Sequence, residues 1–166
     1  MKRKVAWLSF PSVLMMLVAC SSGAKPASTQ TPASPEVVTP KIGIIHVPKF
    51  RIECGVALQL PEDYKGQNKK YVFDGDLAEG GQMNIDGRDV DLMMVDSDEP
   101  ERELKVGDRF TETYAGDGLN AQIEYVVTGI CDPTDESCEV INFDATITVE
   151  RNGAKQQVKT SGLLGC

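Results

Sequence analysis

The chain has 166 residues, with 25 acidic against 17 basic side chains and a net charge of −8. An acidic chain repels the phosphates of nucleic acid and the headgroups of anionic lipids, so this balance argues against a nucleic-acid partner. The length suffices for one domain with a real core and leaves little room for a second.

The first 19 residues are predicted to be a signal peptide. Lys2, Arg3 and Lys4 precede an apolar run over residues 5–19. A membrane-spanning helix needs about 20 apolar residues. This run is shorter, and Pro11 interrupts it. A positive start followed by a short apolar stretch is typical of a secretory signal peptide.

The end of this run carries a more specific motif. Residues 17–20 read LVAC, which resembles the lipobox of bacterial lipoproteins in the order aliphatic, small or aliphatic, small, cysteine. The resemblance covers only the first 20 or so residues, and the alternative is an ordinary signal peptide with a chance cysteine. It implies lipidation of the Cys20 sulfur, cleavage before Cys20 and acylation of the new amino terminus. Ser21 resembles the outer-membrane sorting signal of enteric lipoproteins, because it is not an aspartate.

These features together predict a lipid-anchored protein of the bacterial cell envelope. The resemblance implies the outer membrane, facing the periplasm or the cell surface, with the membrane as a partner through Cys20. A chain carrying more than two acyl groups is stably anchored, since each buried methylene contributes about 0.8 kcal/mol.

Residues 20–40 are predicted to be a disordered tether. They are rich in Ser, Thr, Ala and Pro and contain almost no bulky apolar side chain, so they cannot bury enough surface to fold. Residues 41–166 form the predicted folded domain. Removal of the signal peptide leaves 14 of the 17 basic residues against 25 acidic ones, which gives the mature chain a net charge of −11.

The folded domain reads as β-structure from end to end. Residues 51–60 and 142–150 alternate strictly between apolar and polar side chains, which predicts half-buried strands. Phe143, Ala145, Ile147 and Val149 are the inward positions of the second of these strands. Residues 74–81, DGDLAEGG, are predicted to be a loop, and residues 105–110 a turn that leads into a strand.

Three turn signals join further strands. Asn152-Gly153 is a strong hairpin signal, and a two-residue turn there places Glu150 opposite Lys155 and Ile147 opposite Val158. Asp86-Gly87 and residues 116–118 mark two more turns. About nine short strands at close spacing predict an antiparallel β-sandwich or small β-barrel.

Four cysteines remain if Cys20 carries lipid, and an even number in an exported domain predicts disulfides. Cys131 and Cys138 bracket a turn-rich loop and are expected to pair. Cys54 and Cys166 are then expected to form the second bridge, which would fix the end of the chain to the first long strand. A redox role is disfavoured, because no C-x-x-C motif is present.

No catalytic motif stands out. His46 is the one histidine, no G-x-S-x-G elbow is present, and the sequence predicts no cofactor.

Residues 86–103 are strongly acidic, and Asp96, Asp98 and Glu99 are weak calcium candidates, although the spacing departs from the EF-hand pattern. A solvated strand face and loop is the simpler interpretation. Met93 and Met94 are adjacent, so they point to opposite faces of a strand and do not suggest a copper site.

Three functions are compatible with these features. The first is a non-catalytic envelope lipoprotein whose β-domain binds an unidentified protein or surface component. The second is an envelope hydrolase that acts through carboxylates, whose pairing in space the sequence does not reveal. The third is a calcium-stabilised structural module.

Overall fold

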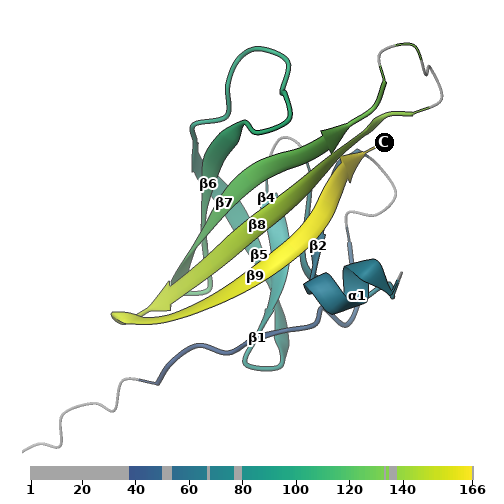
Figure 1. Ribbon diagram of the computed structural model, residues 1–166. Helices are drawn as coiled ribbons and strands as arrows, with labels where there is room; N and C mark the ends of the chain where they lie inside the picture. Colours follow the sequence, from purple (N-terminus) through teal and green to yellow (C-terminus); the bar gives the residue numbers. More distant parts are fainter. Residues whose placement is uncertain are drawn as a thin grey trace, which may run out of the picture. The chain divides into compact units, whose positions relative to one another are not determined.

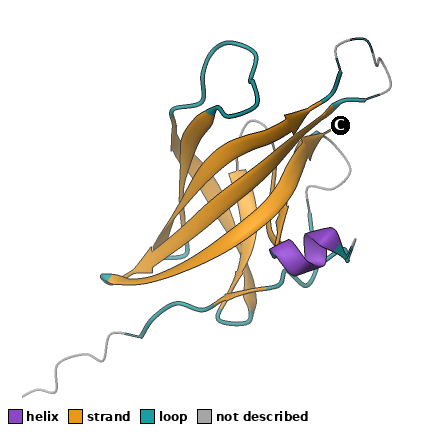
Figure 2. Ribbon diagram, in the orientation of Figure 1, coloured by secondary structure: helices purple, strands orange, loops and turns teal. Residues whose placement is uncertain are grey.

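The structure is a computed structural model that describes residues 38–49, 54–66, 68–76, 80–132, 134 and 138–165. The predicted signal peptide, Cys20, Cys166 and most of the tether lie outside these residues. The described part contains nine strands and one short helix (Figures 1 and 2). In chain order they are β1 (Ile42–Gly43), β2 (Gly55–Gln59), α1 (Pro61–Lys65), β3 (Tyr71–Asp76), β4 (Gly80–Ile85), β5 (Arg88–Ser97), β6 (Arg109–Gly116), β7 (Leu119–Ile130), β8 (Val140–Arg151) and β9 (Ala154–Gly165).

Strands β2–β9 form a closed antiparallel barrel. Each strand pairs with the next in the chain, and β2 pairs with β9 to close the sheet, while β1 adds a short extra strand beside β4. The predicted all-β fold is confirmed, and of the two predicted architectures the barrel is the correct one. Closure leaves no free sheet edge along the paired length of these strands, which protects the protein from edge-to-edge aggregation.

Three two-residue turns lie at one end of the barrel and join β4 to β5, β6 to β7 and β8 to β9. Asp86, Asp117 and Asn152 have positive φ angles of 55°, 49° and 51°, and a glycine with positive φ follows each of them. This conformation matches the right-handed twist of the flanking strands. The predicted register of the last hairpin is confirmed, with Glu150 opposite Lys155 and Ile147 opposite Val158.

The barrel interior is a packed core. Inward positions alternate with outward ones along each strand, and the predicted inward face of β8 is confirmed, because Phe143, Ala145, Ile147 and Val149 are all buried. Aromatic rings fill much of the interior. Phe110 stacks on Tyr125 with ring centroids 4.7 Å apart, and Phe143 contacts both rings edge-on.

Glycines allow two close approaches inside this sheet. A Cβ atom on Gly162 would lie 2.0 Å from the Ala57 carbonyl oxygen, so only glycine lets β9 pair with β2 at this point of closure. A Cβ atom on Gly81 would lie 2.4 Å from the Phe73 ring, which occupies that space instead.

The prediction of a loop over residues 74–81 is wrong, because strands occupy both ends of this range. β3 continues to Asp76 and β4 begins at Gly80, which leaves residues 77–79 between them, outside the described part of the chain. The glycines suggested a turn, but Gly75 and Gly81 pair with each other in the ladder on either side of the Phe73 ring.

The helix α1 was not predicted, because five residues are too few to show helical periodicity. In the part of the chain that the structure describes, no helix has the length and apolar character needed to cross a membrane.

Residues 41–49, called here the N-terminal strap, lie beside β4, with which β1 pairs, and they also contact residues of β3 and β5. The Ile45 N–H donates to the Tyr71 carbonyl oxygen, and Asp89 accepts hydrogen bonds from the N–H groups of His46 and Val47. Lys49 Nζ lies 2.6 Å from Asp91 Oδ2. Acidic side chains of the 86–103 segment thus fix the strap, a role that no local sequence pattern indicates.

Candidate functional site

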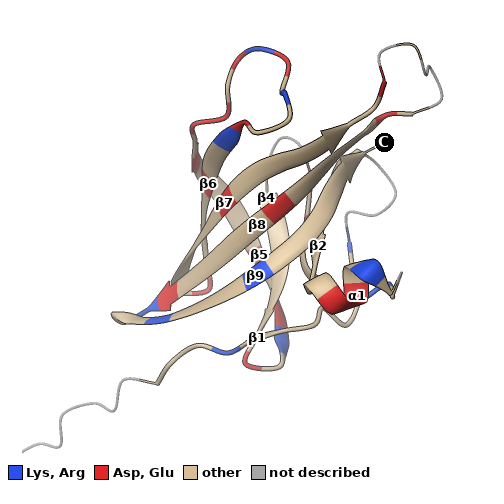
Figure 3. Ribbon diagram, viewed as in Figure 1, with Lys and Arg blue, Asp and Glu red and all other residues tan. Residues whose placement is uncertain are grey.

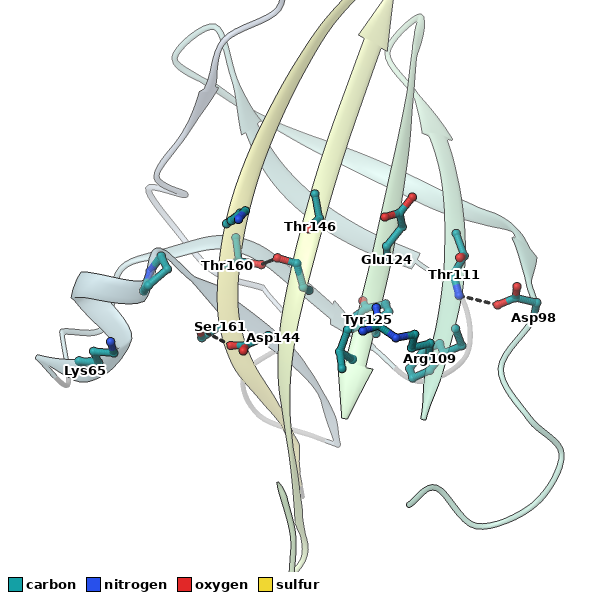
Figure 4. Close-up of a pocket in the computed structure, with 15 residues that line it drawn as sticks. Lys65, Asp98, Arg109, Thr111, Glu124, Tyr125, Asp144, Thr146, Thr160 and Ser161 are labelled. Atoms are coloured by element: carbon teal, nitrogen blue, oxygen red, sulfur yellow. Dashed lines mark hydrogen bonds between the residues drawn. The ribbon is translucent and has the colours of Figure 1, made fainter. Parts of the chain in front are cut away.

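A groove of about 710 Å³ crosses the outer face of β6–β9, from α1 at one end to Asp98 at the other (Figure 4). The backbone and side chains that line it come from α1, the segment after β5, and four neighbouring strands. They are Pro61, Lys65, Asp98, Arg109, Phe110, Thr111, Glu124, Tyr125, Val126, Asp144, Ala145, Thr146, Lys159, Thr160 and Ser161.

The strand register arranges the outward side chains of the groove in two rows. The first row runs Arg109, Val126, Asp144, Ser161, and the second runs Thr111, Glu124, Thr146, Lys159. Period-two alternation explains the arrangement, because the residues between them point into the core. Seven of the eight side chains are polar, so the groove offers charges and hydroxyl groups to a ligand.

Hydrogen bonds hold part of this surface in place. The Ser161 hydroxyl donates to Asp144 Oδ1 at 2.8 Å, and the Thr111 N–H donates to Asp98 Oδ1. The Asp98 N–H donates back to the Thr111 carbonyl oxygen at 3.1 Å. These bonds fix two of the carboxylates at defined positions in the floor and at one end of the groove.

The remaining charges in the groove are free to meet a ligand. Lys65, Arg109, Lys159 and Glu124 are exposed, and none of them forms an ion pair with another described residue. Acidic and basic residues are both spread over the strands and α1 (Figure 3). Outside the groove, many of the basic side chains form ion pairs with carboxylates. The paired cations are Lys49, Lys70, Arg88, Arg102, Arg151 and Lys155.

A second polar cluster lies inside the barrel, on the inner side of β6. Glu112 is 7% exposed and accepts a hydrogen bond of 2.7 Å from the Tyr114 hydroxyl. The Tyr125 hydroxyl is buried close to the Glu112 carboxylate and the Tyr114 hydroxyl. Burial raises the pKa of both tyrosines, and the Glu112 charge raises them further.

Glu99, an exposed residue that follows the end of β5, lies near enough to this cluster to interact with the Glu112 charge. Its partial burial and the nearby Glu112 charge raise its pKa above the usual range of a glutamate. The sequence contains one signal for this cluster. Residues 110–114 alternate Phe110, Glu112, Tyr114 on one face, which places a carboxylate at an inward position between two aromatic residues.

The structure describes one of the two predicted disulfides completely and one cysteine of the other. Cys131 and Cys138 are joined, with Cα atoms 5.6 Å apart. Cys54 is also disulfide-bonded, and its predicted partner, Cys166, lies outside the described residues. The adjoining residues Gly55 and Gly165 pair in the β2–β9 ladder, so the Cys54–Cys166 bridge stays a prediction that this register supports.

The weak calcium candidates point to different neighbours. Asp96 faces Thr113 across the β5–β6 ladder, Asp98 accepts the Thr111 N–H, and Glu99 lies beside Glu112. Within the described residues, no three His, Cys, Asp or Glu side chains are placed to hold a metal ion.

His46 belongs to the strap, where its Nδ1 lies 3.2 Å from both Asp89 Oδ1 and Asn84 Nδ2.

The chain matches no protein-family model, no curated protein and no solved structure at a significant level.

Proposed function

We propose that this protein is a membrane-anchored envelope lipoprotein whose β-barrel is a non-catalytic module that binds a protein or a surface component. The groove with its unpaired charges is the observation that carries the proposal. A site that binds a polar partner needs accessible donors and acceptors at fixed positions, and the groove supplies both.

The dimensions of the groove favour an extended ligand. It crosses four strands, and three interstrand spacings of about 4.8 Å give a width of about 14 Å. The barrel interior is filled by side chains such as Phe110, Tyr125 and Phe143, so the space for a ligand of this size lies on the outside. The free cations at both ends and Glu124 between them suit a partner segment that carries both signs of charge.

The tether supports the same proposal. A flexible chain of the length of residues 20–40 has an average end-to-end distance of about 25 Å. Lipid on Cys20 would therefore hold the barrel close to the membrane and to components of the envelope. Confinement of this kind raises the effective concentration of a partner and makes a modest affinity sufficient.

The carboxylate hydrolase remains the second candidate, because Glu99 and Glu112 lie close enough for one charge to affect the other. A pair of carboxyl groups with unequal environments is the arrangement that glycoside hydrolysis uses. However, Glu112 is buried against Tyr114 and lies away from the lining of the groove, so the structure gives less support to this function. Hydrolysis of envelope glycans by the purified barrel, lost in Glu112→Gln, would favour the enzyme over the binding module.

Capture of partners from native envelopes tests the proposed function. The lipidated protein and a Lys159→Glu variant are compared, and Lys69→Glu serves as the matched control, because Lys69 is exposed and lies outside the groove. We expect a specific partner that is captured by the wild type and by Lys69→Glu and is strongly reduced with Lys159→Glu. Equal capture by all three proteins would show that the groove is not the binding surface.

A further inference from the structure

The last strand, β9, is longer than the strand that closes the barrel against it (Figure 1). All of Ala154–Gly165 pairs with β8, but β2 pairs only with residues 161–165. β2 stops at Gln59 because the chain turns into α1 at Pro61, and proline has no N–H group to donate to the ladder. Residues 154–160, called here the β9 edge, are therefore paired on the β8 side alone within the described part of the chain.

Three residues of the β9 edge direct their backbone N–H and C=O groups away from β8. In an antiparallel pair, hydrogen-bonded and non-hydrogen-bonded residue pairs alternate, and the two residues that flank a two-residue turn form a hydrogen-bonded pair. Arg151 and Ala154 flank the turn between β8 and β9, so Lys155, Gln157 and Lys159 face the open side. None of these outward backbone groups forms a hydrogen bond with another described residue.

The N-terminal strap approaches the β9 edge without pairing with it. The Ile42 N–H donates to Oε1 of Gln156, so a side chain, and not the backbone of β9, makes this contact. Gln156 lies opposite the buried residue Val149 and therefore on the inner side of the sheet. On the same side, Ile42 and Val158 are partly buried against the core. A strand added to the β9 edge would therefore place its inward side chains beside apolar neighbours.

The outward side chains of the β9 edge carry positive charge, although the chain as a whole is acidic. They are Lys155, Gln157 and Lys159, and all three are exposed. Lys155 Nζ lies 2.9 Å from Oε2 of Glu150, which is on β8 and thus away from the open side, whereas Lys159 forms no ion pair with a described residue. The two lysines favour acidic residues at the facing positions of an added strand.

A second copy of the chain is a poor occupant of the β9 edge. Two such edges that paired antiparallel about Gln157 would set Lys155 of each copy opposite Lys159 of the other. Like charges directly opposite each other destabilise a sheet, and lysines on an edge are a common protection against self-association. The same lysines attract a strand of opposite charge, so they discriminate between occupants.

We propose that the β9 edge binds an extended acidic segment of a partner protein by strand addition. The backbone of the segment would pair with Lys155, Gln157 and Lys159, and acidic side chains at every second position would face the two lysines. The inference rests on the proposed function and deepens it, because Lys159 also lines the groove. One partner can therefore contact the groove with its side chains and the β9 edge with its backbone.

Amide hydrogen exchange, followed by NMR in the full-length protein, tests the proposal with two peptides, acetyl-Glu-Val-Glu-Val-Glu-amide and acetyl-Lys-Val-Lys-Val-Lys-amide. The acidic peptide should slow exchange of the Lys155, Gln157 and Lys159 amides by about tenfold or more. The Gln156 and Val158 amides, which already bond to β8, should change little. The basic peptide should bind about tenfold more weakly than the acidic one.

Gln157→Pro separates the backbone of the β9 edge from its side chains. Proline removes the N–H group on the open side and leaves the bonds to β8, and edge strands tolerate proline at such a position. This variant should bind the acidic peptide about tenfold more weakly than Gln157→Ala, which keeps the N–H group. The acidic peptide methylated on every backbone nitrogen makes the same test on the unchanged protein, and it should not protect the edge.

Four results would overturn the inference. They are equal binding of the acidic and basic peptides, binding that Gln157→Pro and N-methylation leave unchanged, protection of the three edge amides before any peptide is added, and protection that rises with protein concentration alone. The last would assign the β9 edge to a second copy. If Lys159→Glu loses the envelope partner while Gln157→Pro still captures it fully, the proposed function stands and this inference fails.

Discussion

Arg151 Nη1 lies 2.6 Å from Asp86 Oδ2, although the two residues are 65 positions apart and belong to different hairpins. Asp86 also accepts a hydrogen bond of 2.8 Å from the Lys41 N–H, where the N-terminal strap begins. Arg88 extends the connection, with its Nη2 atom 3.2 Å from Asp117 Oδ2 in the β6–β7 turn. One end of the barrel is therefore held together by ion pairs between residues in or beside three turns and by a backbone hydrogen bond from the strap.

Asp86→Asn should lower the free energy of unfolding by about 0.5–1 kcal/mol, because the pair with Arg151 is partly exposed and such pairs contribute little. Asparagine tolerates the positive φ of 55° at this position, so the turn itself should persist. Thermal unfolding should show a midpoint lower by about 2–4 °C, and Glu101→Gln is the control. An unchanged midpoint at low salt would mean that the pair contributes no stability.

Acid should release the strap before it unfolds the barrel. Burial tends to raise the pKa of Asp89, but hydrogen bonds from Asn84, His46 and Val47 outweigh it and hold that pKa below its usual value. The hydrogen bonds from Lys41 and Arg151 lower the pKa of Asp86 in the same way. A depressed pKa contributes stability that is present above the unfolded value of about 3.9 and is lost as the pH falls through the folded value.

Amide hydrogen exchange between about pH 5 and pH 2 measures this effect. After correction for the intrinsic exchange rate, the protection of the His46 and Val47 amides should fall before that of the β7–β8 core. Asp89→Asn should have weak strap protection already at neutral pH. Simultaneous loss of strap and core protection would show that the two unfold as one unit.

Cys20→Ala should give a protein that carries no lipid and is not processed as a lipoprotein, since residues 17–20 resemble a lipobox. Metabolic labelling with a fatty acid checks this. Cys54→Ala is not a suitable control because Cys54 is disulfide-bonded, so the wild type is compared with Ser21→Ala, which keeps the cysteine. Label retained in Cys20→Ala would exclude Cys20 as the anchor.

Mass mapping of the unreduced protein, taken directly from the envelope, should identify Cys131–Cys138 and Cys54–Cys166. The first pair is joined in the structure, and the second follows the pairing of Gly55 with Gly165. Closing a loop of more than 100 residues is expected to contribute up to about 4.7 kcal/mol. A Cys20–Cys54 peptide would contradict both the second bridge and lipidation of Cys20.

Calcium should stabilise the barrel no more than magnesium does at equal ionic strength. The Asp98 carboxylate accepts the Thr111 N–H, and Asp96, Asp98 and Glu99 do not converge on one point. Screening of an acidic protein by either salt should give a small and similar rise in the melting midpoint. A calcium-specific rise of more than about 5 °C, abolished by Asp96→Asn with Asp98→Asn, would favour the calcium-stabilised module instead.

Local patterns in the sequence were sufficient to predict most strands of this barrel and its tightest turns, but not the end of β3 or the start of β4. Period-two alternation identified the inward face of β8, and Asn152-Gly153 fixed the register of β8 against β9, because a two-residue turn allows one pairing. The spacing of Cys131 and Cys138 across a short loop likewise indicated their bridge. In each case the interacting residues are close in the chain, so a local sequence pattern is sufficient to predict the contact.

The closure of the sheet, the groove and the proximity of Glu99 to Glu112 were decided by tertiary structure. β2 meets β9 because Gly162 admits the Ala57 carbonyl, and no local pattern relates residues more than 100 positions apart. Lys65 and Arg109 reach one groove only because closure sets α1 beside β9 and the twisted sheet carries β6 to the other side. Glu99 and Glu112 interact because β5 and β6 pair across an eleven-residue connection, residues 98–108. The sequence by itself determined most of the strands and the inward face of β8, since alternation and turn chemistry are local, whereas the neighbours of each charge depend on how the whole sheet curls and closes.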